Sequence, residues 1–279
     1  MDLSKLNPIE KVKHLRNMTG VGIGDCKKAL EEANYDIEEA VLVLRKRGQK
    51  ISSGLKDKDT NEGSVFLYIS ECKKSAAIMT MCCQTDFVAK TDDFCFLGKS
   101  IIEVAVQKKV SSKRDLLVQT FDSGETIESS ITNVSGKIKE NITIKDFGFL
   151  SGRAIYGYLH HNNQVGAIVS IDGGSVAERD DLGFKMALHI TANAPVVINK
   201  EDLNEEIINQ EIQIAKEKAA STGKSEEVVQ KIAEGMAAKS LEDVVLTSQK
   251  FEIDPSLKVK DVLNKKNLEV KAFFRYSIK

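Results

Sequence analysis

The chain has 279 residues, of which 42% are hydrophobic and 29% are charged, and its formal net charge at pH 7 is -1. This composition excludes a mostly disordered chain, and the length suits about two or three compact units. The near-balance of acids and bases gives no reason to expect a nucleic-acid binder or a protein of the membrane surface.

The first fifteen residues are polar and helix-like, with neither an apolar signal core nor an arginine-rich transit pattern. No apolar run in the sequence approaches the roughly 18 residues that a membrane span needs. The five cysteines are odd in number and include no Cys-x-x-Cys pair. We therefore expect a cytoplasmic protein without a disulfide framework.

Residues 1–50 predict a three-helix head. Apolar residues recur there at helical spacing, in three stripes: Ile9, Val12 and Leu15; Cys26, Ala29, Leu30 and Ala33; Ile37, Ala40, Val41 and Leu44. Asp36 followed by Glu39 resembles a capping box at the start of the third helix. The three glycines of TGVGIGD, residues 19–25, predict a tight loop between the first two helices.

A polar, charged linker is predicted over 51–62, followed by a first α+β subdomain over 63–148. Residues 63–71 alternate as a strand, 75–83 form a continuous apolar strand, and a helix follows over about 92–108. The apolar face of that helix is expected to carry Phe96, Ile101, Val104 and Ala105. Further helices are expected near 113–119 and 124–140.

Strands return at 141–150, 153–161 and 164–173, with Asn-Asn-Gln at 162–164 as a hairpin turn, and a helix is expected over 176–192. A strand pair followed by a helix thus occurs twice. This predicts an α+β fold with a second, related subdomain over 149–202, both subdomains having antiparallel sheets.

Residues 203–240 predict two amphipathic helices separated by STGKS at 221–225. The expected stripes are Ile208, Ile212, Ala215 and Ala219 on the first helix, and Val229, Ile232, Ala233 and Met236 on the second. Either a protruding antiparallel hairpin or two helices packed on the domain fits this periodicity. Over 241–279 the chain is expected to return to the second subdomain, with a helix near 259–266 and a last strand at 269–278.

The residues give no catalytic reason for any enzyme class. The glycine-rich stretch at 20–24 follows a predicted helix, whereas a dinucleotide-binding loop follows a strand, and no phosphate-binding Gly-Lys-Ser/Thr loop exists. The neighbouring pairs Cys82-Cys83 and His160-His161 suit a shared metal poorly. His189 lies among apolar residues and fits a packed histidine better than a base. We expect no catalytic residue, cofactor or metal.

The stretch MCCQTDFVAK, residues 81–90, leaves an apolar strand and places Phe87 directly after Asp86. A core phenylalanine and an aromatic anchor for another protein both fit this position, and the residues alone favour the core. Without a catalytic constellation, several separate surfaces favour a protein whose ligand is another protein.

Three long segments resemble the elongation factor Ts family: 15–48 is similar to its amino-terminal signature, 83–90 to its second signature, and 186–195 to a segment around a histidine. The resemblance covers essentially the whole chain in order and spacing. It implies a ubiquitin-associated-like head, a core of two α+β subdomains and an antiparallel coiled-coil hairpin. It also implies a non-enzymatic exchange factor that releases GDP from elongation factor Tu.

By the same resemblance, Thr85, Asp86, Phe87 and Val88 are expected to disturb the Mg²⁺ and phosphate surroundings in the partner. Arg16, Ile23 and His189 are expected to contribute to binding. The resemblance leaves open a dimer of the one-to-one complex.

The chain departs from the family pattern at Ile23-Gly24, where members often carry bulky methionines, so this contact is expected to rest on Ile23. Some members also continue with a carboxy-terminal helical module, and no contact from one is expected beyond Lys279. Two other readings are a protein-binding adaptor that uses the head, and a thiol enzyme that uses Cys82 and Cys83. Nothing near that pair in the sequence would lower a thiol pKa.

Overall fold

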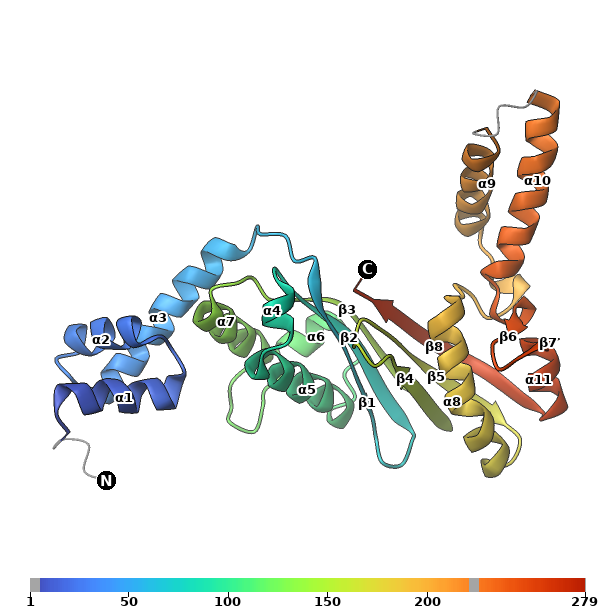
Figure 1. The fold of residues 1–279 in the computed structure, drawn as a ribbon. Helices are drawn as coiled ribbons and strands as arrows, with labels where there is room; N and C mark the ends of the chain where they lie inside the picture. Colours follow the sequence, from blue (N-terminus) through green and yellow to red (C-terminus); the bar gives the residue numbers. More distant parts are fainter. Residues whose placement is uncertain (1–5, 221–225, 279) are drawn as a thin grey trace. The chain divides into compact units, whose positions relative to one another are not determined.

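The computed structural model describes residues 6–220 and 226–278, and Figure 1 shows the order of helices and strands along the chain. The fold is α+β, with sheets of strand order β1-β2-β3, β4-β5-β8 and β6-β7. The chain divides into two compact units. The first comprises Met1–Phe66, Met79–Phe147 and Ile278–Lys279, and the second comprises Leu67–Ile78 and Gly148–Ser277. The boundaries predicted for the head, subdomains and hairpin stay predictions.

Three helices form the head, as the periodicity predicts: α1 (Pro8–Thr19), α2 (Ile23–Glu32) and α3 (Ile37–Leu55). Asn7 and Glu10 form a capping box at the start of α1, and the Asp36 side chain accepts a hydrogen bond from the Glu39 N–H at 2.8 Å at the start of α3. The buried residues all come from the predicted stripes: Leu15, Cys26, Ala29, Leu30, Ala33, Ile37, Ala40 and Leu44. The expected burial of Ile9 is wrong, because its side chain is 70% exposed, and Val12 and Val41 are only partly buried.

The predicted linker begins too early, because α3 continues to Leu55. Ser52 is buried, so this part of the chain has packing partners that a solvent-exposed linker would lack. Helix α3 packs against α7 (Ile127–Ile138), and their backbones approach closely where Gly48 meets Gly136. Tertiary packing therefore extends the helix beyond residue 50, where the polar and charged composition predicts a linker.

In the first α+β segment, β1 (Glu62–Ile69) and β2 (Ser75–Cys83) precede α4 (Asp86–Ala89), α5 (Asp92–Gln107) and α6 (Lys113–Leu117); β3 (Thr143–Ser151) follows α7. Every residue of β2 is buried, which explains its unbroken apolar sequence. Phe94, Leu97, Ile101 and Ala105 form part of the buried face of α5.

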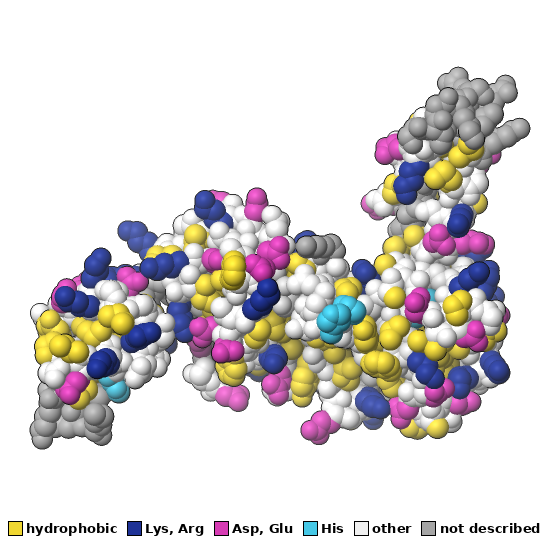
Figure 2. All heavy atoms as spheres, viewed as in Figure 1, with side chains coloured by type: hydrophobic (Ala, Val, Ile, Leu, Met, Phe, Trp, Pro, Cys, Tyr) yellow, Lys and Arg dark blue, Asp and Glu magenta, His cyan; other side chains and the backbone are white. Residues whose placement is uncertain are grey.

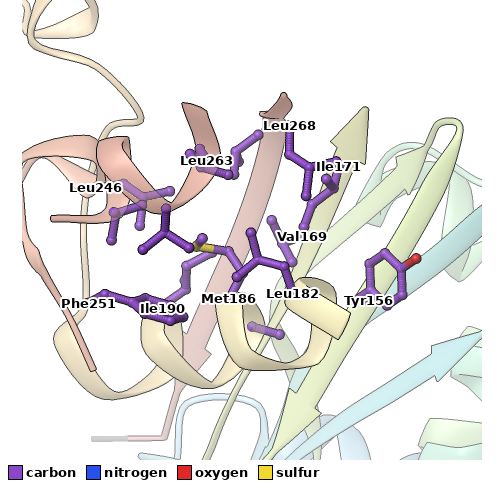
Figure 3. Close-up of a cluster of buried hydrophobic side chains, with 14 of the residues drawn as sticks. Tyr156, Val169, Ile171, Leu182, Met186, Ile190, Leu246, Phe251, Leu263 and Leu268 are labelled. Atoms are coloured by element: carbon purple, nitrogen blue, oxygen red, sulfur yellow. The ribbon is translucent and has the colours of Figure 1, made fainter. Parts of the chain in front are cut away.

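The second unit contains β4 (Ala154–Leu159), β5 (Val165–Gly173) and β8 (Leu268–Ser277), with β4 and β8 both antiparallel to β5. Helix α8 (Val176–Asn193) packs against β4 and β5. Figure 3 shows Leu182, Met186 and Ile190 of α8 beside Val169 and Ile171 of β5, in a core that Leu246, Phe251, Leu263 and Leu268 extend. Burial of such side chains stabilises each by about 1.5–3 kcal/mol.

The same packing device occurs once in each unit. A Cβ on Gly98 of α5 would lie 2.3 Å from the Phe66 ring of β1, and a Cβ on Gly183 of α8 would lie 2.2 Å from the Tyr156 ring of β4. In both helices a buried leucine precedes the glycine. The repeated strand pair and helix therefore share a glycine contact as well as an order of elements.

Helices α9 (Glu205–Ala220) and α10 (Glu226–Asp243) pack against each other. Ala215 and Ala219 are buried as predicted, and so is Ala233. The expected burial of Met236 is wrong, because its side chain is exposed. Ala237, four residues after Ala233 and on the same face of the helix, is buried instead. The predicted break at STGKS lies outside the described residues.

The segments that enter and leave this helical pair are joined by backbone hydrogen bonds. The Val196 N–H donates to the Val244 carbonyl at 2.8 Å, and the Leu246 N–H donates to the Val197 carbonyl at 2.9 Å. Short 3-10 helices lie beside both segments, at Lys200–Asp202 and Leu246–Ser248. The helical pair therefore leaves and rejoins the second unit at one place.

The chain then forms β6 (Lys250–Phe251), β7 (Asp254–Lys258) and α11 (Val259–Lys265) before β8. The β6-β7 pair is absent from the sequence prediction, because a strand of two residues is too short to show alternation. Within residues 6–220 and 226–278, no helix has both the length and the apolar character that a membrane crossing requires.

Candidate functional site

The turn after β2 contains the short helix α4, and local polar groups fix it at both ends. The Thr85 hydroxyl accepts a hydrogen bond from the Val88 N–H at 3.4 Å, and the Thr91 hydroxyl accepts one from the Phe94 N–H at the start of α5, also at 3.4 Å. Both threonines thus occupy N-cap positions. Where the apolar strand ends, the structure thus shows a single helical turn between two caps.

Asp86 and Phe87 point away from the protein interior. Phe87 is 79% exposed, the highest fraction among the large hydrophobic side chains that the structure describes. In Figure 2, hydrophobic and acidic side chains lie at the surface where Figure 1 places α4. The structure therefore decides between the two readings of Phe87: it is not a core residue. An aromatic side chain held at the surface in this way is a typical anchor for a protein partner.

Asp86 carries a negative charge beside Phe87. Its carboxylate accepts a hydrogen bond from Lys90 Nζ at 2.7 Å, and this bond lowers the pKa of Asp86 below its ordinary value. Asp86 therefore stays ionised well into the acidic range. The pair is exposed on both sides, so Lys90 can turn away when a partner approaches.

The other two residues of the predicted element face inward. Val88 is 7% exposed, so it packs α4 onto the unit and offers almost no surface to a partner. Thr85 donates two hydrogen bonds to Glu140, from its N–H at 3.0 Å and from its hydroxyl at 2.7 Å. Within 85–88 the outward groups are Asp86 and Phe87, and Thr85 and Val88 hold them in place.

Cys82 and Cys83 are the last two residues of β2 before this turn, and their thiols are both buried. Burial raises the pKa of both thiols; for Cys83, burial and then the nearby Glu140 raise the pKa to about 12. The raised pKa values disfavour a thiolate at both positions, which argues against a thiol enzyme that uses this pair. Cys72, in the β1–β2 turn, is exposed, and the hydrogen bond with the Ser70 hydroxyl lowers the pKa of its thiol.

The head presents a second outward group of apolar side chains. Ile23, the first residue of α2, is 56% exposed, and Met18 near the end of α1 is 59% exposed. Arg16 is also exposed on α1. The visible face of the head in Figure 2 mixes hydrophobic and basic side chains. Sequence reasoning missed Met18, whose spacing three residues after buried Leu15 looks like core.

The glycine-rich loop of the head lies between α1 and α2 and follows no strand, as the sequence indicates. A Cβ at Gly22 or Gly24 would meet nothing within 4 Å, so these positions leave open space around Ile23. The loop therefore exposes Ile23 and does not form a dinucleotide-binding turn.

His189 is fully buried in the second unit, so its side chain offers no direct contact to a partner. Nε2 lies 2.8 Å from Gln249 Oε1, and Nδ1 accepts a hydrogen bond from the Glu252 N–H at 3.1 Å. This arrangement fits a neutral ring protonated at Nε2. Burial lowers the pKa of His189, whereas the hydrogen bond with Gln249 and the charge of Glu252 act to raise it. The ring joins α8 to residues 249–252, and any role in binding is indirect.

Phe96 corrects the prediction for α5. Expected on its apolar face, Phe96 is 75% exposed, whereas Phe94 and Leu97 take the buried positions. Phe87 and Phe96, nine positions apart in the sequence, thus both lie at the surface of the first unit. Among the described residues, no three His, Cys, Asp or Glu side chains are grouped closely enough to hold a metal ion.

Comparison with known proteins gives one consistent result. The family model described as Elongation factor TS matches residues 84–279. A protein named Elongation factor Ts from Cytophaga hutchinsonii is 35% identical over 270 residues, covering 96% of this chain and 97% of the relative. The proteins of the same name from Chlorobaculum tepidum and Aeromonas hydrophila are also 35% identical to this chain, and each match covers 96% of it. The matches cover 96% of the Chlorobaculum protein and 89% of the Aeromonas protein.

Proposed function

Since the chain belongs to the elongation factor Ts family and is thus a translation elongation factor, we propose that it binds elongation factor Tu carrying GDP and promotes release of that GDP, so that GTP can bind. The observation that carries the proposal is the outward pair of Asp86 and Phe87 on a capped helical turn. This pair joins the most exposed of the described large hydrophobic side chains to an adjacent acid, Asp86.

Exchange requires differential binding. A factor speeds GDP release when it binds the nucleotide-free partner more tightly than the GDP-bound one, and GDP in turn weakens binding of the factor by the same ratio. Insertion of Phe87 between packed elements of the partner would favour a different arrangement there, because packed cores do not deform smoothly. The carboxylate of Asp86 would act on the water shell of the Mg²⁺ that the partner holds with GDP.

The remaining contacts are assigned by exposure. Arg16 and Ile23 belong to the binding surface of the head, with Met18 beside them. His189 contributes by holding the second unit together. The protein itself forms and breaks no covalent bond in this role and needs no cofactor; it acts in the cytoplasm, where its partner delivers aminoacyl-tRNA.

The test is the rate at which labelled GDP leaves elongation factor Tu in excess unlabelled nucleotide, with and without this chain. We expect substoichiometric amounts of the chain to raise the rate, because an exchange factor is released and acts again. An unchanged rate at saturating chain would contradict the proposed function.

A protein-binding adaptor that uses the head predicts a different pattern. Its binding to elongation factor Tu would depend on Ile23 and Met18 and would leave the GDP release rate unchanged. Binding measured by calorimetry beside the release assay therefore separates the two functions.

A further inference from the structure

The carboxylate of Glu140 holds the base of the turn that carries Asp86 and Phe87. Its two oxygens accept separate hydrogen bonds from the N–H and the hydroxyl of Thr85, at 3.0 and 2.7 Å. Thr85 is the N-cap of α4, and the two outward residues follow it directly. One carboxylate therefore fixes both donors of the residue that begins the turn. Hydrogen bonds to an ionised acceptor are stronger than neutral ones.

Glu140 is in turn fixed by the end of α7. The helix ends at Ile138, and Lys139 adopts the left-handed conformation at φ 65°. The hydroxyl of Ser135, which is buried, donates a hydrogen bond to the Glu140 carbonyl. The backbone at Glu140 is thus tied to the last turn of a packed helix, and its side chain has a defined origin.

The same helix end contacts the head. Gly136 lies against Gly48 of α3 so closely that a Cβ on Gly136 would be 2.4 Å from the Gly48 carbonyl oxygen. Lys139 Nζ lies 3.0 Å from Asp25 of α2. Within the first unit, residues 136–140 therefore touch both the head and the turn.

We propose that Glu140 is a positioning residue for nucleotide exchange. Through its hydrogen bonds with Thr85 it fixes the direction of Phe87 and Asp86 relative to α7, and therefore relative to the head, which packs on α7. The inference rests on the proposed function and deepens it. Once the head has docked on the partner, the position of α7 is set, and Glu140 transmits that position to the turn. A small displacement of Phe87 and Asp86 should lower the rate of GDP release more than it lowers the affinity for the partner.

The first test replaces Glu140 by glutamine, which keeps the shape and removes the charge and one acceptor. Glu128→Gln is the matched control, because Glu128 is an exposed glutamate in the first turn of the same helix. Labelled GDP release from elongation factor Tu is measured over a range of concentrations of the intact chain. We expect Glu140→Gln to lower the saturating rate roughly fivefold to tenfold and to leave the half-saturating concentration within about twofold. Glu128→Gln should match the unaltered chain.

The second test separates positioning from a general loss of structure. In a Phe87→Ala background, Glu140→Gln should change the saturating rate by less than about twofold, because the group that it positions is gone. Urea unfolding of each variant is recorded beside the rates. If the two effects multiply in full, Glu140 does not act through Phe87 and the inference is overturned.

A second pair of variants serves if Glu140→Gln does not fold. Thr85→Ser keeps both donors and the cap of α4 and should retain the rate, whereas Thr85→Val loses the hydroxyl both as donor to Glu140 and as cap of α4 and should show a fall at least as large as that of Glu140→Gln. Equal rates for the two would overturn the inference. If the unaltered chain fails to accelerate release, the proposed function fails and this inference with it. If the unaltered chain accelerates release and Glu140→Gln equals it, the inference alone fails.

Discussion

Phe87 is an aromatic ring that the fold of this chain does not use. With 79% of the side chain exposed, its removal should change the free energy of unfolding by no more than about 0.5 kcal/mol. As the proposed anchor in the partner, it should matter much more for exchange. We predict that Phe87→Ala lowers the acceleration of GDP release by at least roughly tenfold with an unchanged urea midpoint.

Phe96 provides the control for that prediction, because it is 75% exposed on the next helix. Phe96→Ala removes a ring of the same size from the same unit and leaves the turn intact. Its release rate should stay within about twofold of the unaltered chain. An equal loss in both variants would show that exposed aromatic area, and not the position of Phe87, drives exchange.

His189 gives a pH-dependent term in stability. Burial lowers its pKa from the ordinary 6.5, so the unfolded chain binds a proton that the folded chain refuses. The free energy of unfolding should therefore be highest above about pH 6.5 and fall as the pH drops from there toward the lowered pKa of the folded state. Protonation at Nδ1 would also break its hydrogen bond with the Glu252 N–H.

Urea unfolding at pH 7.5 and pH 5.5 measures this term. His189→Gln should be less stable than the unaltered chain at pH 7.5 by about 1–3 kcal/mol, because buried polar partners lose their bonds. It should also lose part of the decrease between the two pH values. His161→Gln, a change at an exposed histidine, should keep that decrease. A full decrease in His189→Gln would exclude His189 as its source.

At the scale of elements, each α+β segment relies on a glycine against an aromatic ring. Gly98→Ala and Gly183→Ala would each push a Cβ into a ring, at 2.3 Å from Phe66 and 2.2 Å from Tyr156. We expect each change to destabilise the protein by about 1–3 kcal/mol despite the better helix propensity of alanine.

Gly235 is the matched control, since it lies within α10 with nothing within 4 Å of the added Cβ. Gly235→Ala should stabilise the protein by about 0.5–1 kcal/mol, because alanine loses less backbone freedom on folding. Thermal unfolding of the three variants checks both signs. A gain in stability for Gly98→Ala or Gly183→Ala would mean that the helix shifts and that the contact does not constrain it.

Elements with strong periodicity could be predicted from the sequence, and elements set by distant contacts could not. The continuous apolar run of β2 and the helical stripe of α2 depend on local order and match the structure, whereas in α1 only Leu15 of the predicted stripe is buried and Ile9 is exposed. The length of α3 depends on packing against α7, which lies about eighty residues further along the chain. The exposure of Phe96 could not be predicted either, because an aromatic residue close to Phe94 and Leu97 in the sequence is expected to be in the core.

The candidate site shows the same division. Asp86 and Phe87 were singled out by the abrupt change from apolar strand to acid and aromatic ring. The inward packing of Val88 and the burial of His189 required the structure. Glu140 carried no sequence signal, since a glutamate after a helix is ordinary and Thr85 lies far away in the chain.

At the scale of the whole molecule, the helical pair α9–α10 is an insertion in the second unit, and the segments before and after it are hydrogen-bonded to each other. The bonds between 196–197 and 244–246 close its base independently of the helices above. We predict that replacing residues 205–243 by a short glycine-serine linker leaves the rest of the chain folded. Its melting temperature should fall by no more than about 4 °C, because about 1 kcal/mol changes the midpoint of a chain of this size by 2–4 °C.

Near-ultraviolet circular dichroism and thermal unfolding of the shortened chain test this. Retained aromatic signals and one sharp transition are the expected result. Loss of cooperative unfolding would show that the second unit needs α9 and α10 for its stability.

The uneven chemistry of the thiols has a practical consequence for following this protein in solution. Cys72 is exposed with a lowered pKa, whereas Cys82 and Cys83 are buried with raised pKa values. A maleimide dye at neutral pH and short reaction times should therefore label Cys72 in the β1–β2 turn first and spare the two thiols at the end of β2. Fluorescence anisotropy of a dye on Cys72, the one exposed thiol of the described residues, would then follow complex formation without altering the chain's sequence.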